Sequence, residues 1–584
     1  AGEGADVFIS GGESPVDARY NTFQTFPDSP YSFESVGSII FTGSQFQEEP
    51  IEQDVYVSPF GNNTNSGLHE NEPFQTIQFA LSRINPTSEN PITVHIAEGV
   101  YSPGTNGEIF PVPMLDHTIL MGAGKHKTIL SPDSMTRAIH FSEDEDVHLS
   151  NLGIQSGYML IGAGVFSDHS EFKMSNCSIS RCLAHTSAGM EIFESQVRLE
   201  NVDISNNTSI RDEVVQIASS ILEMNKCTVS HNTGYKGTIS IGSGDTLLND
   251  CLIAFNRNDS SSLGGGAFHC DTNLTLLNCQ IVGNSSAGSS ALINRGNTNL
   301  INCLITGNEN RSNSRTISLS DGKVIIQHCT VAGQSNLDSP WYASVGISGV
   351  DGTIQNSIFW NGIDNEFDID GTVEVTYCNV QNGYPGEGNI NSNPYFSESI
   401  FSDFYLSNGS QGQPASPCID AGSGPATGFD YSSIVEGMNL SHWSTTTDWI
   451  PDSGTLDMGF HWNHNQTSGV ELDLSQYLFG PGDTFSLDAV VKNYTGESWI
   501  NSRLFVALEV QGVFWFAPSW TMSEIDYYPM DLASGEHSIV PIIEPFVWPE
   551  NTGVLYGLAF YGLATNESVS EILGGWDMVE FGYR

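Results

Sequence analysis

Side chains that could act as acids, bases or calcium ligands recur before regularly spaced cysteines in the middle of the chain. Asp245, Asp271 and Asp321 precede the next cysteine of that series by 6, 8 and 8 residues, and His269 and Arg295 lie near them. Two carboxylates about 5–9.5 Å apart can hydrolyse a glycosidic bond, whereas proton abstraction beside a carboxylate needs a base and often bound calcium. Asp245, Asp271 and Arg295 are therefore the best catalytic candidates, although aspartate next to Gly or Thr is also an ordinary turn residue.

Seven of the ten cysteines form this series, and their spacing predicts buried free thiols. A disulfide needs Cα atoms about 4.4–6.8 Å apart with side chains turned toward each other, and stacked neighbours do not easily meet the second condition. Free cysteine is commonly buried as a small hydrophobic residue. No cysteine or histidine spacing indicates zinc. The series consists of Cys177, Cys227, Cys251, Cys279, Cys303, Cys329 and Cys378.

A short pattern repeats along the same region: a polar residue, a Cys or small apolar residue, any residue, then Ile or Val. The second position moves along the chain in steps of 25, 25, 25, 24, 28, 24, 26, 28 and 21 residues. Such a period, rich in β-branched residues and without helical spacing, predicts one solenoid coil per repeat. Its second positions are Leu152, Cys177, Val202, Cys227, Cys251, Cys279, Cys303, Cys329, Ser357 and Cys378.

The expected fold is all-β, with about ten coils of about three short strands each. Successive coils stack at about 4.8 Å, and alternate side chains point the same way, so the Cys and the Ile or Val two places later face the core. An asparagine that follows in several coils suits a tight left-handed turn and can stack along the axis. These asparagines are Asn206, Asn256, Asn284, Asn308, Asn361 and Asn382.

The segments before and after the repeats resemble bacterial secreted right-handed parallel β-helix proteins of the pectate-lyase-like superfamily. The resemblance begins at residues 54–58 and the Gly/Asn-rich residues 61–67, and it ends at residues 416–422 and 457–460. It implies that residues 75–84 form a helix that covers the open end of the solenoid. The fold serves lyases, hydrolases, adhesins and phage tailspikes, so the resemblance specifies the fold far better than the function.

Three domains are expected: an N-terminal arm at 1–53, the β-helix with its cap at 54–462, and a β-sandwich at 463–584. Short apolar runs between turn signals predict the sandwich. Its tryptophans suit a sandwich core or, alternatively, stacking on sugar rings. The arm could lie along its own solenoid or add a strand to a neighbouring molecule. Its apolar interaction residues are Val7, Phe8, Ile9, Ile39, Ile40 and Phe41.

The chain is strongly acidic, with 68 Asp and Glu against 19 Lys and Arg, a net charge of −49. Such a surface repels nucleic acid and anionic membranes. It suits a saline habitat, and it could collect divalent cations such as Ca²⁺, although no cofactor is required. No apolar run is long enough to span a bilayer, and a start at Ala1 suggests a processed, extracellular or cell-surface protein.

Two functions are compatible with these features. The first is a secreted structural protein that assembles with copies of itself into a filament or surface layer, through the arm or the sandwich. The second is a carbohydrate-active enzyme or glycan-binding protein, with a polysaccharide as its partner. The weakness of the catalytic candidates favours the structural protein, and a non-enzyme over an enzyme.

Overall fold

The chain forms two compact units, which are described separately. The first contains the described residues up to Tyr395 together with Leu406–Thr445 and Ile450–His461, and the second contains Phe396–Tyr405, Thr446–Trp449 and Trp462–Arg584. The computed structural model describes residues 50–584 apart from gaps at 259–263, 312–313, 335–343, 362–364, 400–401, 410–411, 436–437, 447–449, 464–468, 475–477, 494–497, 511–512, 523–524, 534–535, 549–554, 570–571, 574–575 and 584. The predicted interaction residues of the arm, Val7 to Phe41, lie outside this part of the chain.

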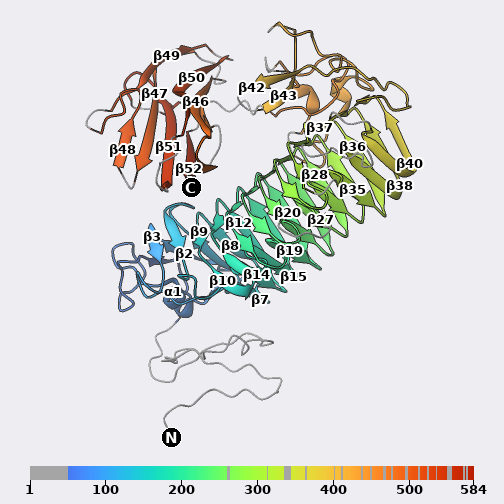
Figure 1. Cartoon of the computed structure of the whole chain (residues 1–584). Coiled ribbons are helices and arrows are strands. Elements are labelled where there is room, and N and C mark those ends of the chain that lie inside the picture. Colours follow the sequence, from blue (N-terminus) through green and yellow to red (C-terminus); the bar gives the residue numbers. More distant parts are fainter. Residues whose placement is uncertain are drawn as a thin grey trace. The chain divides into compact units, whose positions relative to one another are not determined.

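The first unit is a parallel β-helix in which each turn adds a short strand to as many as four parallel ladders (Figure 1). Ladder 1 consists of β3 (Gly99–Tyr101), β6 (Thr128–Leu130), β9 (Gly153–Gln155), β13 (Ser178–Ser180), β17 (Asp203–Ser205), β21 (Thr228–Ser230), β25 (Leu252–Ala254), β29 (Gln280–Val282), β33 (Leu304–Thr306), β37 (Thr330–Ala332), β39 (Ile358–Trp360) and β41 (Asn379–Val380). Ladder 2 consists of β10 (Tyr158–Ile161), β14 (Leu183–Thr186), β18 (Thr208–Ser209), β22 (Thr233–Gly234), β26 (Arg257–Asn258), β30 (Ser285–Ser286) and β34 (Glu309–Asn310).

The other two ladders join into one sheet because two long strands run through both. Ladder 3 consists of β4 (Val112–Pro113), β7 (Ile139–Ser142), β11 (Val165–Asp168), β15 (Met190–Phe193), β19 (Val215–Ala218), β23 (Ile239–Ile241), β27 (Phe268–Cys270), β31 (Leu292–Asn294) and β35 (Ile317–Ser320). Ladder 4 consists of β1 (Val55–Val57), β2 (Ile92–Ile96), β5 (Thr118–Met121), β8 (Val147–Ser150), β12 (Glu171–Ser175), β16 (Gln196–Glu200), β20 (Ile221–Asn225), β24 (Asp245–Asn249), β28 (Asn273–Leu277), β32 (Thr298–Ile301) and β36 (Lys323–Gln327). The shared strands are β38 (Val345–Gln355) and β40 (Phe367–Thr376).

The predicted all-β solenoid is confirmed, with two differences of detail. The 12 strands of ladder 1 mark about eleven turns instead of about ten, because two turns precede the first repeat motif. Most turns have four strands instead of three, because the short strands of ladder 2 are too brief to stand out in the sequence. All ten cysteines are buried free thiols. The ladder residues Cys177 and Cys227 point inward, as do Ile179 and Val229 two positions later.

Of the asparagines expected in left-handed turns, Asn206 and Asn382 adopt that conformation, and the other four do not. A left-handed residue also recurs at the first position of the repeat motif. Asn176, for example, has φ 51°. Ten residues adopt this conformation in successive coils: Asn151, Asn176, Asn201, Lys226, Asp250, Asn278, Asn302, His328, Asn356 and Tyr377. The chain thereby leaves ladder 4 and enters ladder 1 through a corner that hides the next side chain in the core.

A buried amide ladder lies at the corner between ladders 1 and 2, and its membership corrects the prediction. Asn206 has φ 57° and is exposed, whereas the next residue, Asn207, points inward. Asn382 is likewise left-handed and outside the ladder. After the first member, the side-chain oxygen of each member accepts the backbone N–H of the member one coil before it, at 2.9–3.3 Å. The members are Asn207, Asn232, Asn256, Asn284, Asn308, Gln334 and Asn361.

The cap helix α1 (Ile77–Arg83) closes the first turn, as the resemblance implied for residues 75–84. The Thr76 hydroxyl accepts the N–H of Phe79 at 3.3 Å. The Glu108 carboxylate accepts the first helical N–H, from Ile77, at 2.7 Å, which satisfies donors that have no partner within a helix. No helix in the described ranges is long and apolar enough to cross a bilayer.

The exit segment, residues 418–461, covers part of the outer surface of the first unit. Met438, Leu440 and Trp443 bury the side chains of Leu277 and Ile301 at the C-terminal ends of β28 and β32. The 3₁₀ helices η1 (Ala426–Gly428) and η2 (Leu440–His442) shape this segment. It therefore continues the hydrophobic core on the outside of ladder 4.

The second unit contains two sheets around one core, as predicted for the C-terminal sandwich. One sheet contains β44 (Gly469–Leu474), β46 (Thr484–Asn493) and β50 (Glu536–Val547), all antiparallel. The other contains β45 (Leu478–Phe479), β47 (Trp499–Val510), β48 (Val513–Phe516), β49 (Tyr528–Leu532), β51 (Leu555–Thr565) and β52 (Asp577–Tyr583). A separate two-stranded sheet is formed by β42 (Phe396–Ser399) and β43 (Ser402–Leu406).

Candidate functional site

The catalytic candidates from the sequence do not all come together. Asp271 follows β27 and accepts a bond from Arg295 Nη1 at 2.8 Å, and Arg295 also lies 3.3 Å from His269 Nε2. Asp245 begins β24 and pairs in register with Asn273, whose amide donates to it at 2.8 Å.

The different positions of these aspartates before their cysteines explain the separation. Six residues before the cysteine is the start of a ladder 4 strand, whereas eight residues before it is the turn that follows ladder 3. Asp321 lies in that turn, after β35, with φ 57°. The three aspartates therefore do not form one row, as the spacing had suggested.

A denser group of ionisable side chains lies on the outer face of ladder 3, several turns closer to the N-terminus. The Arg137 guanidinium lies 4.2 Å from the centre of the Phe166 ring and donates to the Ile161 carbonyl at 3.2 Å. Burial lowers the pKa of Arg137 to about 10, against the opposing effect of Glu191. His140 contacts the same ring edge-on at 5.2 Å, and burial lowers its pKa to about 4. His140 is therefore neutral at pH 7, while Arg137 keeps its charge.

Acidic side chains from the next coils surround this aromatic–cationic pair. Ser187 donates a short hydrogen bond to the Glu191 carboxylate. Burial raises the pKa of Glu191, and the negative charges of Glu213 and Asp212 add to that rise. Asp212 also forms an ion pair with Lys236. The group thus contains more carboxylates than cations.

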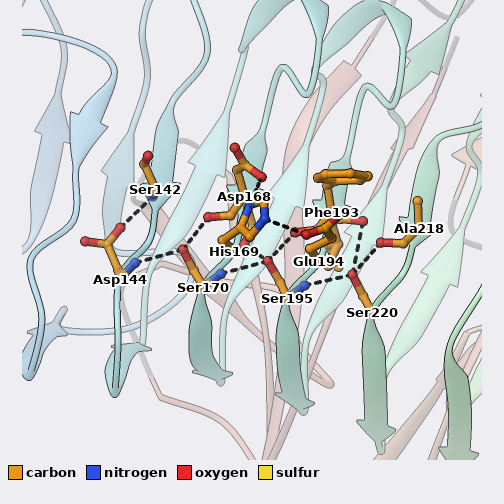
Figure 2. A network of polar contacts seen from close by, with 12 residues as sticks. Ser142, Asp144, Asp168, His169, Ser170, Phe193, Glu194, Ser195, Ala218 and Ser220 are labelled. Atoms are coloured by element: carbon orange, nitrogen blue, oxygen red, sulfur yellow. Dashed lines mark hydrogen bonds and ion pairs between the residues drawn. The ribbon is translucent and has the colours of Figure 1, made fainter. Parts of the chain in front are cut away.

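His169 lies at the neighbouring corner between two carboxylates. Its Nδ1 is 2.6 Å from Asp168 Oδ1, and its Nε2 is 2.5 Å from Glu194 Oε2 (Figure 2). The hydrogen bond with Asp168 is the main cause of the raised pKa of His169. Because a neutral imidazole has one N–H, donation to both carboxylates requires the charged form.

A row of serines fixes this corner. The N–H of Asp144, Ser170 and Ser195 donates to the hydroxyl of the serine one coil later, each at 3.0 Å (Figure 2). The hydroxyls of Ser170, Ser195 and Ser220 donate to the carbonyl two residues earlier, at 2.7–2.9 Å. Asp144 ends the row, and burial raises its pKa to about 7. The backbone that carries Asp168, His169 and Glu194 is therefore held on both sides.

Strand register arranges the outward side chains of ladder 3 in two rows. One row runs through His140, Phe166, Glu191 and Gln216. The second row runs through Ser142, Asp168, Phe193 and Ala218. We call these eight residues, with Arg137, His169 and Glu194, the ladder 3 strip. Rings, charges and hydrogen-bonding groups therefore recur along the solenoid axis at the strand spacing of about 4.8 Å.

Sequence reasoning missed this strip, although a signal was present. His140, Phe166, Glu191 and Gln216 each lie 11 or 12 residues before the second position of the next repeat motif. They vary in chemistry from coil to coil, whereas the second position of the motif is usually Cys and the fourth is usually Ile or Val. A search for residues that recur 11 or 12 positions before the second position of each motif would have found them.

In the part of the chain that the structure describes, no group of three or more His, Cys, Asp or Glu side chains is arranged to hold a metal ion. Calcium collection by the acidic surface stays a prediction.

Comparisons with known proteins found one family match and similar solved structures. Residues 60–145 match a family described as a protein of unknown function, DUF1565. No curated protein matches the chain significantly. The crystal structure of pectate lyase Pel9A is similar at 14% identity and a TM-score of 0.37, covering 70% of this chain and 96% of that one. A pectin methylesterase from carrot is similar at 10% identity and a TM-score of 0.25, covering 57% and 90%.

Proposed function

We propose that this chain is a secreted glycan-binding protein on a parallel β-helix scaffold, with the ladder 3 strip as its binding surface. The observation that carries the proposal is the strip itself: aromatic rings, carboxylates and a guanidinium in register on one outward face. Binding without bond cleavage is proposed, because the Asp245 and Asp271 carboxylates lie in different rows and are bonded to different partners, Asn273 and Arg295.

The aromatic side chains of the strip are suited to sugar rings. Phe193 is 38% exposed on β15, and Phe166 is held between Arg137 and His140. An exposed aromatic face combined with adjacent polar groups is a common way to bind an amphipathic ligand. Since both rings belong to a rigid ladder, little conformational entropy would be lost on binding.

The charges of the strip select among polysaccharides. Glu191, Asp168 and Glu194 outnumber Arg137 and His169 on this face, and the whole chain carries a net charge of −49. A uronate polymer would be repelled at long range. Neutral polysaccharides and those with free amino groups are the ligand classes that fit.

Binding can be measured by calorimetry with three oligosaccharide families: neutral glucans, amino-bearing glucosamine polymers and polygalacturonate. Phe193→Ala should weaken binding of a neutral or amino-bearing ligand about two- to tenfold, from the 0.5–1.5 kcal/mol of an aromatic contact. Phe60→Ala is the control, since Phe60 is 93% exposed and lies outside the strip. Preferential binding of polygalacturonate, or equal losses for both variants, would refute the proposal.

A second candidate function is self-assembly into a filament or surface layer, and the C-terminal unit favours it. β50 is the last strand of its sheet, and Ile539, Phe546 and Val547 are exposed along it. β48 ends the other sheet with Val513 and Phe514 exposed. Apolar strands at sheet edges are templates for pairing with another chain.

Negative-stain electron microscopy in high salt with calcium, and again after dialysis into chelator, tests self-assembly. Regular fibres or sheets that are lost in Phe514→Lys would support this function. Dispersed single particles in both buffers would exclude it under these conditions. The arm residues Val7 to Phe41 can be tested in the same way by deletion of residues 1–53.

A further inference from the structure

The start of ladder 2 presents an apolar face to solvent. Tyr158, Leu160 and Ile161 of β10 are exposed, together with Leu183 of β14. Ile210 and Tyr235, which directly follow β18 and β22, are exposed as well. We call these six residues the ladder 2 face. Contiguous exposed apolar side chains of this kind usually mark an interaction surface.

The ladder 2 face lies along the first four of the seven ladder 2 strands, β10 to β22. The register row that starts with Tyr158 and Leu183 continues through Thr208, Thr233, Arg257, Ser285 and Glu309. The residues equivalent to Tyr158 therefore become polar after two coils. An occupant that covers the ladder 2 face therefore needs to reach from β10 to the residue after β22.

β10 is also the first strand of ladder 2, and its outer edge is only partly bonded. It pairs with β14 on one side, and no other strand pairs with it among the described residues. The Tyr158 N–H donates to the Thr136 carbonyl at 2.9 Å, so residues 135 and 136 border this edge. Arg137 also donates to the Ile161 carbonyl at 3.2 Å, so the exposed apolar side chains, and not a free strand edge, make this face a site for a covering segment.

The described chain begins at the same end of the solenoid. Ile51 bridges Ile84, directly after α1, and α1 and β10 lie at one end of the solenoid in Figure 1. Three steps of about 4.8 Å separate β1 from β8, the ladder 4 strand that precedes β10. The 49 residues before residue 50 could span up to about 160 Å, so their length does not limit their reach.

Composition and charge match this segment to the face. Residues 1–49 contain the apolar runs 7–9 and 39–41, with eight acidic residues and one basic residue. Arg181 and Arg211 are exposed beside β14 and β18, in a chain where acidic residues outnumber basic ones by 68 to 19. An acidic segment with apolar runs therefore complements an apolar face with a basic border.

We propose that residues 1–49 cover the ladder 2 face of their own molecule, with the apolar runs 7–9 and 39–41 against β10 and β14. A tethered segment acts at a high effective concentration, which favours its own solenoid over a neighbour. This inference is independent of glycan binding, since it concerns ladder 2 and not the ladder 3 strip.

Methionine oxidation of the full chain tests the proposal. Met135 borders the face and is 63% exposed in the described structure, and Met522 of the C-terminal unit is a matched reference at 58%. In dilute peroxide, followed by peptide mass spectrometry, Met135 should oxidise several-fold more slowly than Met522. A full-length variant with serine at Val7, Phe8, Ile9, Ile39, Ile40 and Phe41 should equalise the two rates.

Three outcomes would overturn the proposal. Equal oxidation of Met135 and Met522 in the unmodified chain would show that the face is uncovered. Protection of Met135 that persists in the serine variant would show that another element covers it. Protection that disappears on dilution would assign the covering segment to a second molecule.

Discussion

A buried histidine–aspartate pair is expected to hold the exit segment on the solenoid. His461 and Asp452 have side chains 0% and 1% exposed, with His461 Nε2 2.8 Å from Asp452 Oδ2. The same carboxylate oxygen accepts the N–H of Asp457 at 2.8 Å. The backbone of His461 exchanges two hydrogen bonds with the Asn302 side chain, at 2.7 and 2.8 Å. The pair therefore joins the end of the exit segment to a corner of the β-helix.

Asp452→Ala tests this role, because it leaves the buried imidazole and the Asp457 N–H without their acceptor. Removing one member of a buried pair costs about 3–5 kcal/mol. Burial, followed by the charge of Asp452, raises the pKa of Asp457 to about 6, so the substitution also relieves a repulsion. We therefore expect the lower end of the range, about 3 kcal/mol.

Native-state hydrogen exchange of peptides from residues 418–461 measures the effect where it arises. A loss of about 3 kcal/mol corresponds to about 100-fold faster exchange if the segment opens locally. Asp168→Ala is the matched control, since it breaks an Asp–His contact of 2.6 Å between half-exposed side chains and should cost about 0–1 kcal/mol. Equal, small effects of both substitutions would refute the role assigned to Asp452.

Other perturbations have equally definite expected results. Burial raises the pKa of Asp144 to about 7 in the folded chain, so the folded state loses stability as the pH rises from 4 to 7, and the full loss is present at pH 8. In urea unfolding, Asp144→Asn should therefore raise the free energy of unfolding by roughly 1–4 kcal/mol at pH 8 and change it little at pH 4. Asn284→Ala removes the acceptor of two buried donors of Asn256 and should cost about 2–6 kcal/mol, whereas Asn206→Gly, at an exposed left-handed position, should be nearly neutral. Burial raises the pKa of the Cys177 thiol to about 11, and all ten thiols are buried, so a thiol reagent should label none in the native chain and ten in denaturant; rapid native labelling would contradict the buried ladder.

The sequence by itself determined the repeating interior. Each coil must place a small side chain and a β-branched one inward, so Cys177, Ile179 and their equivalents recur near a 25-residue period. The cap helix was also predictable, because its resemblance to related openings rests on local residues around Thr76. A local requirement that recurs in every coil leaves a repeating pattern in the sequence. The pattern can be recognised even though the coils differ in length, from 21 to 28 residues.

The tertiary structure decided which polar side chains meet. Asn206 is exposed, whereas Asn207, one position later, belongs to the buried amide ladder. Asp245 is in register with Asn273, two positions after Asp271, so the two aspartates lie in different rows. His461 pairs with Asp452 where the exit segment packs back against the β-helix. There the N–H of His461 donates to Asn302, which lies 159 residues earlier in the sequence. Strand register and turn length fix such distances, and neither follows from the spacing of residues within one repeat.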